Sequence, residues 1–118
     1  MNLPGWDNRP RPSPYSPATL VLVHGGGSTT LTVAPGQRLL VGRNPEAAIV
    51  VTDPAISPNH ALIERRGPGW LVTSLDACNP TLILDSTGRA QPIEGQLGLR
   101  SGELLVGGCQ ILLYPPAP

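Results

Sequence analysis

The sequence contains no lysine and no phenylalanine, and only 3% of its residues are aromatic. Its eight basic residues are therefore all arginines, and they are spread along the 118 residues rather than clustered. Sequence-independent binding to nucleic acid or to an anionic membrane requires a basic patch, and stacking on single-stranded nucleic acid requires aromatic side chains. We therefore expect neither nucleic acid nor membrane as a partner.

Cysteines and long apolar runs are also scarce. Cys78 and Cys109 are too few for a disulfide framework and have the wrong spacing for a zinc site, so we expect reduced thiols, no metal and no cofactor. No apolar stretch has the length of a signal peptide core or of a membrane span. These features predict a cytoplasmic protein, and the lack of lysine beside abundant alanine, glycine, proline and arginine suggests a bacterial source. The oligomeric state does not follow from the sequence.

Proline and glycine are abundant, and they divide the chain into short segments. Fifteen prolines and fourteen glycines separate runs of valine, leucine and isoleucine, and no stretch repeats apolar residues with the helical period. About eleven short strands with regular turns indicate an all-β fold, a β-sandwich of two sheets with an aliphatic core. The strands are predicted at residues 20–23, 29–33, 38–41, 49–51, 61–65, 70–74, 81–84, 91–93, 97–99, 103–106 and 110–114.

The two ends of the chain differ from this pattern. Residues 1–16 are rich in proline and polar residues, which predicts a disordered tail. The Pro-x-x-Pro spacings in this tail are too common in disordered segments to indicate an SH3 ligand. We therefore expect one domain over residues 17–115 and a short C-terminal tail over residues 116–118.

Three polar fragments fall where loops are predicted between strands. A guanidinium group binds phosphate through two parallel hydrogen bonds, which gives Arg43 a reason to follow an apolar run. Ser57 could add a hydroxyl donor, and Asn79 could bind a peptide backbone through its amide. The fragments predict one anion-binding surface, and they are Gly-Arg-Asn-Pro at 42–45, Ser-Pro-Asn-His at 57–60 and Asn-Pro-Thr at 79–81.

In this order and spacing the fragments resemble the forkhead-associated (FHA) domain, which binds phosphothreonine peptides. The resemblance extends over residues 18–114. It implies that Arg43 and Ser57 bind the phosphate and that Asn79 binds the main chain of the peptide. It further implies that the peptide site is lined by Asn44, Pro58 and Cys78. A supporting role in the structure of the site is implied for Gly42, His60 and Thr81.

The function implied by the resemblance is a phosphothreonine-binding module without enzymatic activity. Its partner would be a phosphoprotein or a phosphorylated Ser/Thr kinase, which the module would recruit or sense in kinase signalling. Three residues depart from the family pattern. Pro58 stands where a basic residue is frequent, Ala77 where a small hydroxyl residue is usual, and Pro80 where glycine is common. A phosphate-independent interaction module with the same fold is therefore a second hypothesis.

A third hypothesis is a hydrolase that uses Ser57 as nucleophile and His60 as base. The sequence gives it little support. No nucleophile elbow surrounds Ser57, no acidic residue is placed to orient His60, and the two side chains stand three residues apart on a loop. We therefore predict no catalytic residues.

Overall fold

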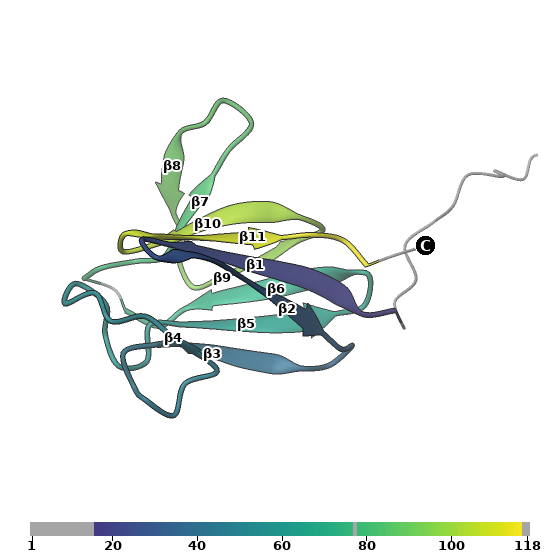
Figure 1. The fold of residues 1–118 in the computed structure, drawn as a ribbon. Helices are drawn as coiled ribbons and strands as arrows, with labels where there is room; N and C mark the ends of the chain where they lie inside the picture. Colours follow the sequence, from purple (N-terminus) through teal and green to yellow (C-terminus); the bar gives the residue numbers. More distant parts are fainter. Residues whose placement is uncertain (1–15, 77, 117–118) are drawn as a thin grey trace, which may run out of the picture.

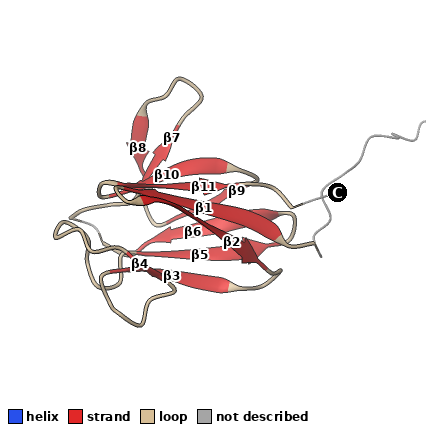
Figure 2. Ribbon diagram, in the orientation of Figure 1, coloured by secondary structure: helices blue, strands red, loops and turns tan. Residues whose placement is uncertain are grey.

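The computed structural model describes residues 16–76 and 78–116. Eleven strands form two sheets, and the described residues contain no helix, as Figures 1 and 2 show. The prediction of an all-β, two-sheet sandwich of about eleven strands is confirmed. With no helix among these residues, none of sufficient length and apolarity to cross a membrane is found there. The predicted N-terminal tail, apart from Ser16, and residues 117–118 lie outside the described residues.

The strands divide into a six-stranded and a five-stranded sheet. All pairings are antiparallel except that of β3 with β4. The first sheet has the order β2-β1-β11-β10-β7-β8, with β1 (Ala18–His24), β2 (Gly27–Val33), β7 (Leu82–Leu84), β8 (Ala90–Pro92), β10 (Gly102–Val106) and β11 (Cys109–Leu113). The second has the order β4-β3-β5-β6-β9, with β3 (Arg38–Gly42), β4 (Ile49–Val50), β5 (Ala61–Arg66), β6 (Gly69–Ser74) and β9 (Gln96–Leu99).

The first hairpin is tighter than the sequence predicted. The turn between β1 and β2 consists of Gly25 and Gly26 alone, because Gly27 already pairs with His24. The glycine with a positive φ angle is Gly27, at +132°, the first residue of β2, a backbone conformation that glycine adopts without strain. The glycine run at this point is therefore a hairpin turn.

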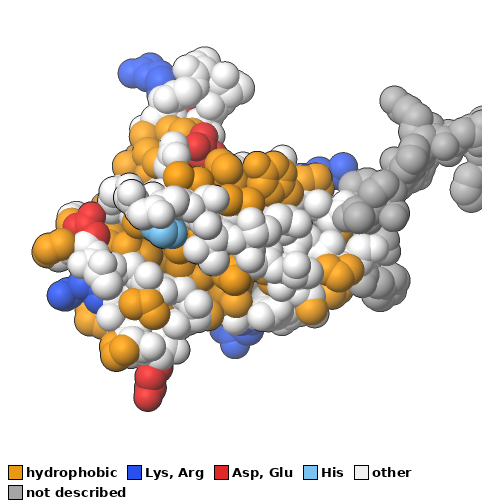
Figure 3. Space-filling view, in the orientation of Figure 1, with side chains coloured by type: hydrophobic (Ala, Val, Ile, Leu, Met, Phe, Trp, Pro, Cys, Tyr) orange, Lys and Arg blue, Asp and Glu red, His pale blue; other side chains and the backbone are white. Residues whose placement is uncertain are grey.

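The core lies between the sheets and is built from side chains that alternate along the strands. It is aliphatic except for Trp70, which is 2% exposed. Both sheets contribute, as the buried residues Leu20, Val33, Val41, Ile63, Val72, Leu104, Ile111 and Leu113 illustrate. Figure 3 shows that the arginines on the face in view stand apart from one another.

The sandwich brings three loops to one end. Figure 1 shows the β3–β4, β4–β5 and β6–β7 connections at the end that lies away from the chain termini of the described region. The turn between β10 and β11 lies at the same end. The three polar fragments of the sequence therefore come together although up to about forty residues separate them.

Candidate functional site

The first two polar fragments are joined through their backbones. The Arg43 amide donates to the Ser57 carbonyl oxygen over 3.0 Å, and the Asn44 amide donates to the Pro58 carbonyl oxygen over 3.3 Å. This close approach depends on Gly42. A β-carbon on Gly42 would lie 1.9 Å from the Pro58 oxygen, so any side chain would force the β3–β4 and β4–β5 loops apart.

The Arg43 side chain is exposed, but one of its nitrogens is held. Its Nε donates to the backbone oxygen of Ile56. Among the described residues, no hydrogen-bond partner is found for its two terminal amino groups. The hydrogen bond at Nε thus fixes the guanidinium group, and its two terminal amino groups can donate to an oxyanion in parallel. This geometry suits a phosphate group.

Ser57 lies beside Arg43 in the chain fold, but its hydroxyl does not face solvent. The Oγ atom is buried and has no hydrogen-bond partner among the described residues. The phosphate-binding role predicted for Ser57 therefore requires its side chain, or the atoms that cover it, to move on binding.

His60 connects three segments of the site from a buried position, with 1% of its surface exposed. Its amide donates to the Val41 oxygen over 2.8 Å, and its carbonyl oxygen accepts the Leu75 amide over 2.9 Å. Its Nδ1 lies 3.3 Å from the Ser57 amide and accepts that hydrogen, which requires the neutral ring protonated at Nε2. The ring therefore fixes the backbone of the loop that supports Arg43.

Protonation of His60 should destabilise the fold. Burial lowers the pKa of His60, and the weaker opposing influence is the Asp76 carboxylate, 4.0 Å from Nδ1. Because the unfolded chain binds a proton at a higher pH than the folded chain, stability is complete above about pH 6.5 and decreases as the pH falls. Denaturant unfolding between pH 7 and pH 5 should show this loss, at no more than about 1.4 kcal/mol per pH unit.

Replacement of His60 by alanine should flatten that pH dependence. Asp53 and Asp85 do not contribute to the change in stability between pH 7 and pH 5. Their lowered pKa values affect stability only below their ordinary value of 3.8. An unchanged slope in His60→Ala would show that the ring is not the titrating group.

The third fragment is ordered by Asp76, which the sequence analysis did not single out. Its Oδ1 accepts the amides of Cys78, at 2.9 Å, and of Asn79, at 3.2 Å. Both of these residues are exposed, so their side chains can meet a ligand. An aspartate two and three residues before the amides that it binds is a known turn-forming pattern, and this pattern could have identified Asp76. Ala77 lies outside the described residues.

Thr81 is fully buried and ends the third loop. Its amide donates to the Ser74 hydroxyl over 3.3 Å, and its carbonyl oxygen accepts the Ile93 amide over 2.9 Å. The structure therefore places it under the loop, where it connects the start of β7 with the end of β6 and the segment after β8.

Asp53 ties the β4–β5 loop to the neighbouring β10–β11 turn. One carboxylate oxygen accepts the Ala55 amide over 2.9 Å, and the other accepts the Gly108 amide over 3.0 Å. These two hydrogen bonds lower the pKa of Asp53. The sequence analysis did not single out Asp53, and its contact across 55 residues leaves no local signal.

A hollow of about 270 Å³ lies against Asn79. Its floor includes the buried His60 ring and apolar side chains of the β4–β5 loop, β7 and β10. An apolar side chain of a peptide bound beside Asn79 would fit into this hollow. The lining residues are Ala55, Ile56, His60, Cys78, Asn79, Pro80, Leu82, Leu105 and Gly107.

Comparison with known proteins identifies the fold and the family. The FHA domain family matches residues 39–106, which contain all the polar fragments described above. The chain belongs to the FHA domain family. The FHA domain-containing protein FhaB of Mycolicibacterium smegmatis is 33% identical over 64 residues, which cover 54% of this chain and 41% of FhaB. The chain thus matches less than half of the length of that relative.

Solved FHA domains have the same fold. The FHA domain of CT664 from Chlamydia trachomatis has a TM-score of 0.72 and 27% identity, over 84% of this chain and 97% of that one. An FHA domain solved in work on phosphothreonine-dependent FHA interactions has a TM-score of 0.67 and 22% identity, over 84% of this chain and 96% of that one. The second similarity shows the fold alone.

Proposed function

We propose that this FHA domain binds phosphothreonine-containing segments of partner proteins and so recruits or senses phosphorylated proteins in Ser/Thr kinase signalling. The observation that carries the proposal is the Arg43 side chain, which is exposed, held at Nε by Ile56 and directed from loops that Gly42 and His60 keep together. The interactions of the similar FHA domain that depend on phosphothreonine support the same assignment.

In this proposal different loops bind different parts of the phosphopeptide. Arg43 supplies two charged donors to the phosphate, which carries nearly two negative charges at neutral pH. Ser57 rotates to add a hydroxyl donor, and Asn44 and Pro58 line the phosphate on either side. The exposed Asn79 binds the peptide main chain, with Cys78 beside it. The hollow against Asn79 takes an apolar side chain of the same segment.

A catalytic use of Ser57 and His60 is not supported by their contact. His60 Nδ1 accepts the backbone amide of Ser57 and not its hydroxyl, so the ring is not placed to remove the hydroxyl proton. FHA domains are binding modules, and we infer that this chain is one without enzymatic activity.

The proposal is tested by calorimetry with a phosphothreonine peptide selected from a phosphopeptide library and with the same peptide lacking the phosphate. We expect binding of the phosphorylated form only. Equal binding of the two forms would instead identify a phosphate-independent interaction module, the alternative suggested by the departures from the family pattern at Pro58, Ala77 and Pro80.

The two cysteines should respond differently to a thiol reagent. Cys78 is exposed beside the proposed peptide, whereas Cys109 is partly buried in β11. Burial and the nearby Asp53 carboxylate raise the pKa of Cys109, so less of it is the reactive thiolate. Mass spectrometry should find Cys78 modified first, and a saturating phosphopeptide should slow its modification. Faster labelling of Cys109 would contradict this placement of the loop.

A further inference from the structure

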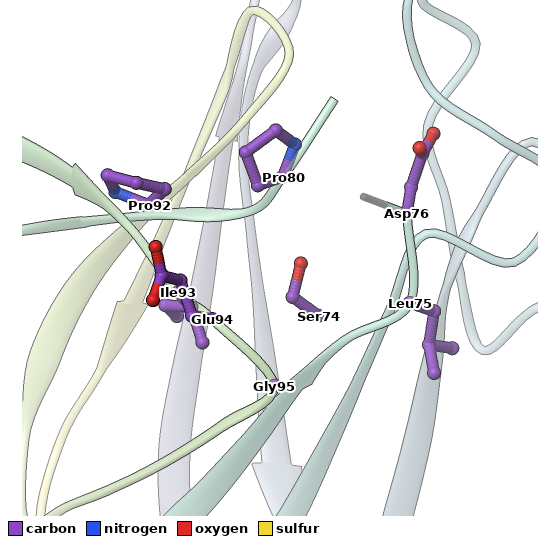
Figure 4. A pocket seen from close by; sticks show the side chains of 8 residues that line it. All are labelled: Ser74, Leu75, Asp76, Pro80, Pro92, Ile93, Glu94 and Gly95. Atoms are coloured by element: carbon purple, nitrogen blue, oxygen red, sulfur yellow. The ribbon is translucent and has the colours of Figure 1, made fainter. Parts of the chain in front are cut away.

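A second hollow, of about 470 Å³, lies next to the loop that carries Asn79. Figure 4 shows it between the segment that leaves β6 and the segment that joins β8 to β9. Pro92, Ile93 and Glu94 stand on one side and Asp76 on the other. It is separate from the hollow that His60 lines, and the two share only Pro80.

The chemistry of this hollow is of two kinds. Pro80, Pro92 and Ile93 present apolar surface, while Asp76 and Glu94 add carboxylates, and no basic residue lines it among the residues described. A long side chain with an aliphatic stem and a cationic head matches this combination, because such side chains pack their methylene groups on apolar surface and keep the charge at a polar edge. An anionic side chain would be repelled.

The two carboxylates are not equivalent. Asp76 already accepts the amides of Cys78 and Asn79, and these bonds hold its carboxylate toward the β6–β7 loop. Glu94 lies in the segment between β8 and β9 and is exposed. We therefore assign the charged contact of an incoming cation to Glu94.

We propose that this hollow binds an arginine or lysine side chain of the same phosphorylated segment that Arg43 and Asn79 bind. The proposal rests on the proposed phosphothreonine function and adds a partner preference to it. The two sites are adjacent, because Asp76 both accepts the Asn79 amide and borders this hollow, and Pro80 lines both hollows. The phosphate and the basic side chain would thus be recognised at adjacent sites.

The experiment uses a set of phosphothreonine peptides with a single arginine moved through the flanking positions, and the same peptides with glutamine in its place. At one position we expect arginine to improve the affinity about three- to tenfold over glutamine, as a partly exposed charge pair allows. Glu94→Gln should abolish that preference. Glu103→Gln, on the strand β10, is the matched control and should retain it.

The outcomes separate this proposal from the function on which it rests. Phosphate-dependent binding without a preference for arginine at any position overturns the inference and leaves the proposed function intact. A preference that survives in Glu94→Gln overturns the assignment to this hollow. Equal affinity for phosphorylated and unphosphorylated peptides overturns both.

Discussion

Replacement of Arg43 by alanine is expected to weaken binding of a phosphothreonine peptide by about ten- to a hundredfold or more. The guanidinium supplies two exposed charged donors, and hydrogen bonds to charged groups contribute roughly 1.5 to 3 kcal/mol each. The melting temperature should change little, because the side chain is exposed and makes one hydrogen bond to the backbone. Calorimetry with the phosphorylated peptide measures the loss.

The matched control is Arg100→Ala, which removes another exposed arginine located after β9. Its affinity for the phosphopeptide should remain close to that of the wild type. Asn79→Ala should also weaken binding without unfolding the domain, since its proposed partner is the peptide backbone. Wild-type affinity in Arg43→Ala would reject phosphate binding at this site and favour the phosphate-independent module.

Most of the strands could be predicted because this sequence separates them with glycine and proline. The segments at 61–65 and 70–74, for example, became β5 and β6 with a shift of one residue at one end, since alternation of apolar residues and a Gly-Pro-Gly turn both indicate a hairpin. The order of the strands within each sheet could not be predicted from the sequence. The parallel pairing of β3 with β4 (Ile49–Val50) could not be predicted either, because a strand of two residues carries almost no pattern.

The candidate site likewise has features that the sequence predicted and features that it did not. Arg43 and Asn79 are exposed at loops of one end, where short motifs predicted them. The burial of the Ser57 hydroxyl could not be predicted, because a rotamer is chosen by its surroundings. Both supporting aspartates accept an amide two residues ahead, which is a local turn pattern, whereas the hydrogen bond from Gly108 to Asp53 joins a turn that is distant in sequence.

Arg65 has an environment that the sequence analysis did not predict. It is one of eight arginines spread along the sequence, yet it is 1% exposed. Alternation along β5 places it on the same face as Ala61 and Ile63, so the inward direction was present in the pattern. A charged residue at the end of such a pattern is usually taken as exposed, because burial of an unpaired charge is costly. Here the charge is matched by carbonyl oxygens.

Those carbonyl oxygens belong to three separate segments at the end of the sandwich away from the site. Nη1 of Arg65 donates to the Val33 oxygen over 2.8 Å and to the Ser16 oxygen over 3.1 Å. Nη2 donates to the Ser16 oxygen over 3.1 Å and to the Gly67 oxygen over 3.2 Å. The guanidinium also lies 5.5 Å from the centre of the Trp70 ring. One side chain therefore connects the segment before β1, the end of β2 and the β5–β6 turn.

Replacement of Arg65 by alanine should accordingly lower the free energy of unfolding by roughly 3 to 5 kcal/mol, because it leaves buried carbonyl oxygens unpaired and a cavity beside Trp70. Arg66→Ala is the matched control. Arg66 is exposed and its Nη2 lies 3.5 Å from Glu64, so its loss should cost less than about 1 kcal/mol.

If Arg65→Ala does not fold, Arg65→Lys serves instead, since it keeps the charge but loses the planar set of donors. Denaturant unfolding of either variant within about 1 kcal/mol of the wild type would show that the carbonyl oxygens find other partners.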